Sequence, residues 1–401
     1  MVIACAPDYR GKVEAAGIAF HPLRPGYEEL QRDLGMDRAQ LAHAAVARVD
    51  FLFRKLVLPY VRTAYEDMMR IMPDADLVLS SSLAFGARMA AEKCGIPWIA
   101  VILQPMMFLS AYDPPAIPKA EWVGEVLRRL GPKATGYALW TLKQAVNVLF
   151  RPLHSIRAEL KLPPITRNPL FDGQFSEAGA IGLYSSLFGG VQPDYPQPTS
   201  ITGFACFDSK DGSAATLDPK LGLFLRGGSP PLVFTLGSLI VNSPGSFYRD
   251  SLDAARILNR RAVLLVGDDV RGEYARWGSA DVFVCAYAPH SLLFAHAAAI
   301  VHHGGIGTMG QALRSGRPQL VVPFFADQLD NAARAVRLGV ARTLSPRRYS
   351  GTGASRALDG LLSDGRYAER ARAVGDSVAA EDGAARAARF VLDRLEQLRR
   401  K

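Results

Sequence analysis

The sequence predicts an α/β protein made of two doubly wound domains, each built on a parallel sheet. Short apolar runs alternate with longer segments of helical periodicity along the whole chain, as is typical of parallel sheets. The 401 residues are enough for two domains with separate cores. A polar, glycine-containing stretch near the middle interrupts the alternation and indicates a connection between the domains.

Six strands are expected in the first half. They are Val2–Ala6, Ile18–Pro22, Leu77–Ser80, Trp98–Leu103, Ala180–Tyr184 and Ser200–Gly203. Helices are expected from Asp8 to Ala16 and from Leu83 to Cys94, because each segment is followed by the glycine that commonly ends a helix. The long helical region 119–160 carries an apolar stripe. This stripe predicts packing between helices, with an apolar binding cleft or a membrane-facing patch as alternatives.

The polar stretch at 205–229 predicts domains at 1–212 and 213–383, followed by a terminal helix at 384–401. The segment from Ala384 to Leu398 is rich in alanine, arginine and leucine, which favour helix. Six more strands are expected in the second domain. They are Pro231–Leu236, Arg261–Val266, Val282–Ala286, Ala299–Val301, Pro318–Pro323 and Ala341–Leu344.

Charge and cysteine usage exclude several classes of protein. The net charge is +9, but the basic residues are scattered, so a solvated surface with a modest pull toward anionic ligands or lipid headgroups is expected, and no nucleic acid. The four cysteines have no C-x-x-C spacing, which argues against a disulfide framework and a thiolate zinc site. No signal peptide or membrane-spanning run is seen. We expect a cytoplasmic protein, with peripheral contact at the inner membrane face as a further hypothesis.

The most informative segment runs from Ala299 to Leu313, where an apolar strand leads into a glycine loop and then into a helix. Glycines let a ligand approach the backbone closely, and the helix N-terminus presents unsatisfied N–H groups to it. This arrangement favours a phosphate or diphosphate, with His303 and Thr308 as additional donors. The alternative is a tight turn without a ligand.

The same loop contains a competing motif. Gly305, Gly307 and Gly310 spell G-x-G-x-x-G, and Asp327 follows at about the distance of a dinucleotide fingerprint. An oxidoreductase using NAD(P) or FAD is therefore an alternative. Against it, the motif lies deep in the second domain, Gly310 should fall inside the helix, and Asp327 follows Pro323 in a loop.

The glycine loop and two neighbouring runs together carry a family resemblance. The three runs are Tyr287-Ala288-Pro289-His290, His302-His303-Gly304-Gly305-Ile306-Gly307-Thr308, and Pro323 with Asp327-Gln328-Leu329-Asp330-Asn331. Together they resemble the donor-binding signature of family 1 nucleotide-sugar glycosyltransferases. The sequence is most similar to the bacterial branch of rhamnolipid-forming rhamnosyltransferases, sterol glucosyltransferases and antibiotic glycosyltransferases. The resemblance implies the GT-B architecture: two Rossmann-like domains facing a cleft, with the donor in the C-terminal domain and the acceptor in the N-terminal domain.

The resemblance also implies roles for individual residues. Nucleobase contacts fall to Tyr287 by stacking, to the Ala288 backbone, and to His290, which would lie near the base or ribose. Diphosphate contacts fall to His303, Gly304, Gly305, Gly307 and Thr308, and to Ser238 in the run Thr235-Leu236-Gly237-Ser238. The ribose would contact Gln311, and the sugar hydroxyls would contact Asp327 and Gln328. Simpler interpretations remain: Tyr287 in the core, His290 as a loop histidine, Asp327 as a helix N-cap and His302 as a structural residue.

The expected reaction is an inverting transfer from a UDP- or dTDP-sugar to a hydroxyl of a hydrophobic or lipid acceptor, without metal or cofactor. The acceptor cleft is expected along the loop 109–115 and parts of 119–160. Relatives open with a strand–loop–helix unit that supplies the general base, whereas this chain begins with what resembles their second strand. No residue is therefore assigned as the base. A truncated donor-binding protein with little activity is a further alternative.

Overall fold

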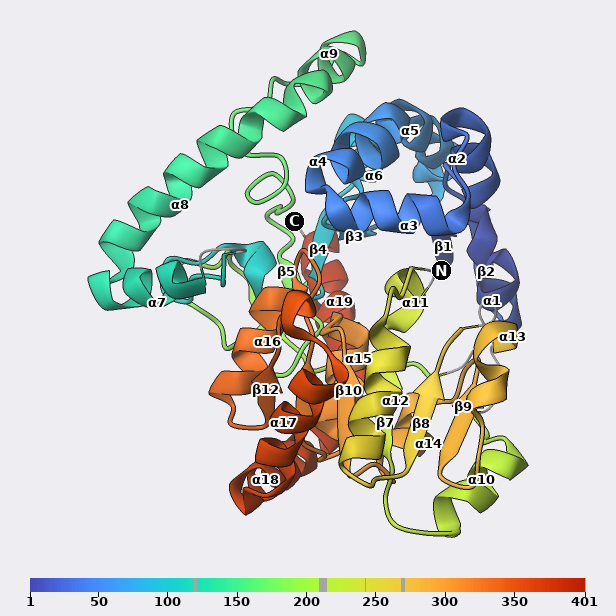
Figure 1. The fold of residues 1–401 in the computed structure, drawn as a ribbon. Helices are drawn as coiled ribbons and strands as arrows, with labels where there is room; N and C mark the ends of the chain where they lie inside the picture. The colour runs from blue at the N-terminus through green and yellow to red at the C-terminus, as the bar shows by residue number, and fades with distance from the viewer. Residues whose placement is uncertain (118–120, 209–214, 242, 268–270, 401) are drawn as a thin grey trace.

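The computed structural model describes residues 1–117, 121–208, 215–241, 243–267 and 271–400. It shows two α/β domains with parallel sheets, as predicted (Figure 1). All twelve predicted strands are present, with ends shifted by one or two residues. The predicted boundary between residues 212 and 213 lies outside the described residues.

The C-terminal domain is built on one parallel sheet of six strands, in the order β12-β11-β10-β7-β8-β9. The strands are β7 (Leu232–Thr235), β8 (Ala262–Leu265), β9 (Val282–Cys285), β10 (Ala299–His302), β11 (Gln319–Val321) and β12 (Ala341–Thr343). The chain moves outward from β7 to β9 and then returns to the other side of β7 as β10, where His302 is in register with Thr235. This reversal makes the β7–β10 pair the topological switch point of the sheet, where ligands of such folds bind.

Helices cover both faces of this sheet, which explains why its central strands are apolar on both sides. On β7, Leu232 and Phe234 pack toward one face with Leu252 and Leu358, whereas Val233 packs toward the other face. The helices are α10 (Pro219–Arg226), α11 (Gly237–Ile240), α12 (Phe247–Ile257), α13 (Arg271–Tyr274), α14 (His290–Phe294), α15 (Ile306–Arg314), α16 (Gln328–Arg337), α17 (Gly351–Leu362) and α18 (Gly365–Ala379).

The strands of the N-terminal domain are divided between two sheets. Four strands pair in the order β3-β4-β5-β6, and β1 pairs with β2 separately. They are β1 (Val2–Cys5), β2 (Ala19–Pro22), β3 (Val78–Ser81), β4 (Trp98–Ile102), β5 (Ala180–Gly182) and β6 (Thr199–Ile201). In the described part of the chain no ladder joins β1 to β3, so each of these strands has one edge without a strand partner.

The first helices of this domain have recognisable end signals. Asp37 accepts a hydrogen bond from the Gln40 backbone N–H while the Gln40 side chain accepts from the Asp37 N–H, a capping box that begins α3. Gly95 ends α6 with a φ of 68°. The helices are α1 (Arg10–Ala15), α2 (Tyr27–Leu34), α3 (Arg38–Ala47), α4 (Val49–Phe51), α5 (Val61–Met69) and α6 (Phe85–Cys94).

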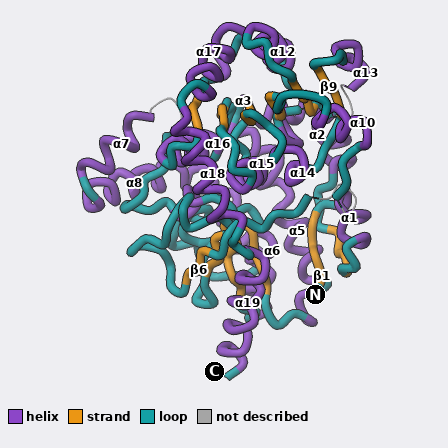
Figure 2. The backbone as a smooth tube through the Cα atoms, turned by 90° about the horizontal axis from the view of Figure 1, so that it is seen from below, coloured by secondary structure: helices purple, strands orange, loops and turns teal. Residues whose placement is uncertain are grey.

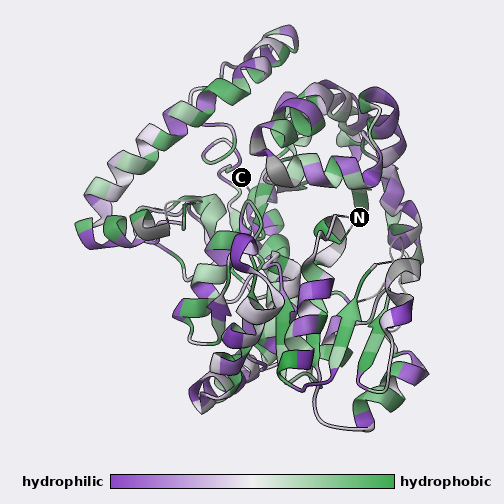
Figure 3. Cartoon of the chain, in the orientation of Figure 1, coloured by the Kyte–Doolittle hydropathy of each residue, from purple (hydrophilic) through white to green (hydrophobic). Residues whose placement is uncertain are grey.

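The predicted helical region forms an arm that projects from the N-terminal domain (Figure 1). It consists of α7 (Glu121–Leu130), α8 (Pro132–Asn147) and α9 (Arg151–Glu159). One face of α8 is buried through Thr135 and Leu139, but Tyr137 and Trp140 are exposed and stack on each other. Figure 3 shows apolar residues along the arm. The stripe is thus only partly a helix-packing surface. None of the described helices is long and apolar enough to cross a bilayer.

The terminal helix α19 (Gly383–Arg399) packs against the sheet of the N-terminal domain, on the side of the molecule that carries β6 (Figure 2). Phe390 and Val391 join the cluster of Ile99 and Ile181, and Arg394 donates to the Ala178 carbonyl. The chain therefore crosses between the domains twice. A shared core also joins the domains, in which residues of β4 and β5 pack with residues of α15 and α18.

Candidate active site

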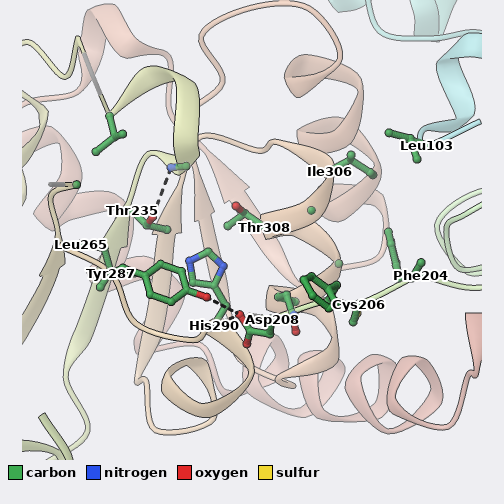
Figure 4. Close-up of a pocket in the computed structure, with 18 of the residues that line it drawn as sticks. Leu103, Phe204, Cys206, Asp208, Thr235, Leu265, Tyr287, His290, Ile306 and Thr308 are labelled. Atoms are coloured by element: carbon green, nitrogen blue, oxygen red, sulfur yellow. Dashed lines mark hydrogen bonds between the residues drawn. The ribbon is translucent and has the colours of Figure 1, made fainter. Parts of the chain in front are cut away.

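A cavity of 710 Å³ lies at the switch point of the C-terminal sheet, at the carboxyl ends of β7 and β10 (Figure 4). Its size and position suit a small-molecule ligand. Both domains contribute to its wall. The N-terminal domain and the connecting segment contribute Lys12, Arg38, Leu103, Leu183, Phe204, Ala205, Cys206, Phe207 and Asp208, and the C-terminal domain contributes Thr235, Gly237, Val241, Leu265, Gly267, Ala286, Tyr287, His290, Ile306, Gly307, Thr308, Gly310 and Gln311.

His303 lies between two glycine turns at the ends of these strands. A Cβ atom on Gly237 would lie 2.5 Å from Cε1 of His303, and a Cβ atom on Gly305 would lie 2.2 Å from Nε2. Any larger residue at either glycine would therefore collide with the imidazole. Gly237 also has a φ of 67°, which disfavours other residues. The two glycines thus make room for an imidazole ring beside the cavity.

The His303 imidazole is neutral over the physiological pH range. It is 9% exposed, and burial lowers its pKa to about 3, with the neighbouring His302 and His290 acting in the same direction. Its Nδ1 atom has no hydrogen-bond partner among the described residues. A buried polar atom without a partner is uncommon in a folded protein and indicates a place for a ligand or water.

The N-terminus of α15 faces the same cavity. Gly305 is the N-cap of this helix and has no side chain with which to cap it. A Cβ atom on Gly307 would meet no atom within 4 Å, and Thr308 lines the cavity wall. The first turn of α15 therefore points its N–H groups and the positive end of its dipole toward the open cavity, next to the Thr308 hydroxyl. This is the arrangement that binds phosphate groups.

His302 has a structural role. It is fully buried, its Nδ1 accepts a hydrogen bond from the Gly304 N–H, and its Nε2 lies 3.0 Å from the Gln319 side-chain oxygen. These contacts require the neutral form protonated at Nε2. Burial lowers the pKa of His302 to about 4, which maintains that form. This histidine shapes the turn that presents the glycine loop.

Tyr287 and His290 line the end of the cavity nearest to α14 (Figure 4). Tyr287 is 39% exposed, so it lies on the cavity wall rather than in the core. The His290 ring stacks on Phe294 at 4.4 Å, and burial lowers its pKa. The Ala288 side chain is buried in the core and does not line the cavity.

Gln311 is 6% exposed and lines the cavity from α15, and its side-chain oxygen has no partner among the described residues. Asp327 and Gln328 do not line this cavity. The Gln328 oxygen accepts from the backbone N–H groups of Phe324 and Phe325, at 2.8 and 3.3 Å. Asp327 stands at the N-cap position of α16, as the simpler interpretation expects, but its side chain makes no capping hydrogen bond and its carboxylate accepts from the Asn331 amide.

Several predicted elements lie elsewhere. Ser238 belongs to α11, but its side chain is outside the described part of the structure. The loop 109–115 and helix α8 do not line the 710 Å³ cavity; they border a separate cavity of 490 Å³. Among the residues that sequence reasoning missed, Asp208 lies in the stretch 205–229 interpreted only as a connection, and Phe204 immediately precedes that stretch. No local pattern identifies them, because their neighbours come from distant parts of the chain.

The glycine pattern does not have the geometry of a dinucleotide fingerprint. Gly310 lies inside α15, where a Cβ atom would be 2.7 Å from the Phe204 ring. Its missing side chain thus serves packing against the connecting segment. Asp327 precedes α16 and is not at the end of a strand. The oxidoreductase alternative is therefore not favoured.

Two parallel α/β domains with a ligand cavity between them, at the switch point of the second, define the GT-B class of glycosyltransferase fold. Residues 253–393 match the family model of the erythromycin biosynthesis protein CIII-like C-terminal domain. The chain is 28% identical to the vancomycin aglycone glucosyltransferase of Amycolatopsis orientalis, over 98% of this chain and 90% of that protein. These similarities support the assignment of the chain as a family 1 glycosyltransferase.

Two other relatives extend the comparison. The sterol 3-beta-glucosyltransferase of Aspergillus terreus is 26% identical over 98% of this chain, which spans 28% of that protein's length. The crystal structure of glycosyltransferase VinC in complex with dTDP has a TM-score of 0.67 and 19% identity, and the match covers 99% of this chain and 92% of that chain. This structural likeness supports the shared fold.

Proposed function

We propose that the protein transfers a sugar from a UDP- or dTDP-sugar to a hydroxyl group of a hydrophobic or lipid acceptor, with inversion at C1 and without a metal ion. The observation that carries the donor part is that the α15 N-terminus opens into one cavity through Gly307 and Thr308, while His303 is packed against the glycine turns next to it. The dTDP complex of VinC is a further reason to choose a nucleoside diphosphate.

The chemistry follows from where charge develops. When the bond from C1 to the diphosphate oxygen breaks, negative charge grows on the diphosphate. The α15 N–H groups, the Thr308 hydroxyl and the neutral His303 imidazole are donors to that charge, and one such donor contributes about 3 kcal/mol to a transition state. Because these donors are held by the fold, no metal ion is needed to neutralise the leaving group in this proposal.

The acceptor part rests on the other wall of the cavity. Leu103 and Leu183 follow β4 and β5 of the N-terminal domain and line the same cavity as Ile306. Leu103 is 45% exposed. Apolar side chains facing the reacting centre favour an apolar acceptor, because its burial is favourable by about 25 cal/mol per Å². The sterol glucosyltransferase among the relatives agrees with this choice.

Calorimetric titration with UDP, dTDP, NADP and FAD tests the donor site. We expect UDP or dTDP to bind, and the dinucleotides not to bind. His303→Ala should weaken nucleoside diphosphate binding about tenfold or more, because charge-assisted hydrogen bonds contribute about 1.5–3 kcal/mol. His296→Ala is the control, since His296 is exposed, whereas His303 is buried against Gly237 and Gly305.

Binding of NADP or FAD in preference to UDP and dTDP would contradict the proposal, as would unchanged affinity of His303→Ala. Activity is then measured as release of UDP or dTDP from UDP-glucose or dTDP-rhamnose, with and without a sterol or a hydroxylated fatty acid. Release that depends on the apolar acceptor supports the second half of the proposal. Release that depends only on polar acceptors would contradict it.

A further inference from the structure

The segment that joins the two domains reaches into the end of the cavity that contains Tyr287. Asp208 lies in this segment and lines the cavity beside Tyr287 (Figure 4). Its Oδ1 accepts a hydrogen bond from the Tyr287 hydroxyl at 3.3 Å and another from the His290 backbone N–H at 3.1 Å. Its Oδ2 accepts from the Ser291 N–H at 2.5 Å. One carboxylate therefore connects the aromatic wall of the site to the beginning of α14.

We infer that Asp208 is a positioning residue of the nucleobase site, which holds the Tyr287 ring in place for stacking. The inference rests on the proposed function, since it assigns the base of a nucleoside diphosphate to this end of the cavity. A half-exposed tyrosine loses side-chain freedom when a ligand stacks on it, and this loss weakens binding. A tyrosine already fixed by a carboxylate avoids much of that cost.

The segment just before Asp208 contacts both domains. The Phe204 ring lies against Gly310 of α15, and the Lys12 ammonium group lies 5.0 Å from the centre of the Phe207 ring. Lys12 belongs to α1 of the N-terminal domain. The connecting segment is thus anchored on either side just before Asp208, so the position of its carboxylate depends on the arrangement of the two domains.

The charge on Asp208 also distinguishes the two ends of the cavity. Its carboxylate occupies the N–H groups at the start of α14, so these groups are not available to a phosphate, and its negative charge repels one. The α15 end carries N–H groups and Thr308, and no carboxylate other than that of Asp208 lines the cavity among the described residues. A nucleoside diphosphate is therefore oriented with its uncharged base toward Asp208 and its diphosphate toward α15.

The test compares UDP with inorganic pyrophosphate by calorimetric titration of the full chain. For Asp208→Ala we expect UDP affinity to fall about tenfold and pyrophosphate affinity to stay within about twofold of the wild type. Asp208→Asn keeps one accepting oxygen, so its UDP affinity should lie between the affinities of the wild type and of Asp208→Ala. Tyr287→Phe loses only the hydroxyl contact, so UDP affinity should fall about threefold.

Asp364→Ala is the matched control, because Asp364 also accepts a backbone N–H at a helix start but lies outside this cavity. It should leave both affinities unchanged. Equal affinity of wild type and Asp208→Ala for UDP would overturn the inference while leaving the proposed function intact. An equal loss of UDP and pyrophosphate binding would also overturn it, since that result indicates a purely structural role. A wild type that binds neither probe would instead contradict the proposed function.

Discussion

At the scale of single residues, the site depends on what two glycines leave out. The imidazole of His303 fills the space where side chains of Gly237 and Gly305 would stand. The sequence predicts His303 and the second glycine turn from one continuous run. It cannot predict that the first glycine turn contacts the same ring, because Gly237 lies 66 positions before His303 in the sequence. That contact depends on the parallel pairing of β7 with β10, which local periodicity does not encode.

Replacing Gly237 tests this contact. Gly237→Ala places a Cβ 2.5 Å from His303 and strains a backbone with a φ of 67°. The backbone strain costs about 1 kcal/mol, and displacement of the imidazole should weaken UDP binding about tenfold in addition. Gly245→Ala is the control, because Gly245 has a φ of 55° but meets no atom within 4 Å.

Urea unfolding should show a similar backbone penalty for the two alanine variants, and titration with UDP should separate them. If both variants bind UDP equally well, the position of His303 does not depend on Gly237.

At the scale of elements, α16 is fixed to the N-terminal domain by a buried group of charges. Arg334 is 2% exposed and pairs with Asp330 at 2.6 Å and with Asp113 at 2.5 Å. Asp330 also accepts from the Ala116 N–H. The loop near 113 therefore touches the helix that begins with Gln328, beside the predicted sugar-binding residues. Asp113 and Arg334 are 221 positions apart, so no local pattern predicts their contact.

Arg334→Met removes the shared cation from this group. Asp330 is fully buried, so its charge would lose its main compensation, and breaking such a pair costs about 3–5 kcal/mol. We expect a clear decrease in the urea midpoint. Arg366→Met removes an exposed partner of Asp364 and should leave the midpoint unchanged. Equal midpoints for Arg334→Met and wild type would show that the buried charges do not hold the domains together.

At the scale of the whole molecule, the order of elements could be predicted, and much of their assembly could not. Apolar runs and glycine stops locate all twelve strands and the terminal helix, because periodicity reflects burial on one or both faces. The return of α19 to the first domain and the division of the N-terminal strands into two sheets depend on contacts between distant segments. For the same reason, the sequence motifs locate the cavity wall near α15, where we propose the diphosphate binds, better than the wall from the N-terminal domain.

The buried histidines make global stability depend on pH. Burial lowers the pKa of His302 to about 4 and of His303 to about 3, and it also lowers the pKa of His290. Their unfolded pKa is about 6.5, so below that pH the unfolded chain binds protons that the folded chain does not. The stabilisation is complete above pH 6.5 and is lost progressively as the pH falls from there toward the folded pKa values.

Each such histidine should decrease the free energy of unfolding by about 1.4 kcal/mol per pH unit in this range. Urea midpoints measured from pH 7.5 to 5 check the slope, a window chosen to lie above the usual carboxylate pKa values. His302→Asn, whose side-chain oxygen can replace Nδ1 as acceptor, should reduce the slope. An identical slope in this variant would contradict the assignment of His302 as a buried neutral base.

Because α19 returns to the first domain, the second domain is in topological terms an insertion into the first. The two chain segments that cross between the domains are in contact where Gly203 meets Gly383. The Ser185 hydroxyl donates a hydrogen bond to the Glu381 carboxylate nearby. Because the two crossings are adjacent, they would act as one hinge. Such a hinge permits the domains to rotate apart about one axis and resists translation or twisting of one domain against the other. The cavity borders this hinge, because Phe204 lies beside Gly383 and also lines the cavity wall, so the two crossings keep the walls in register at that end.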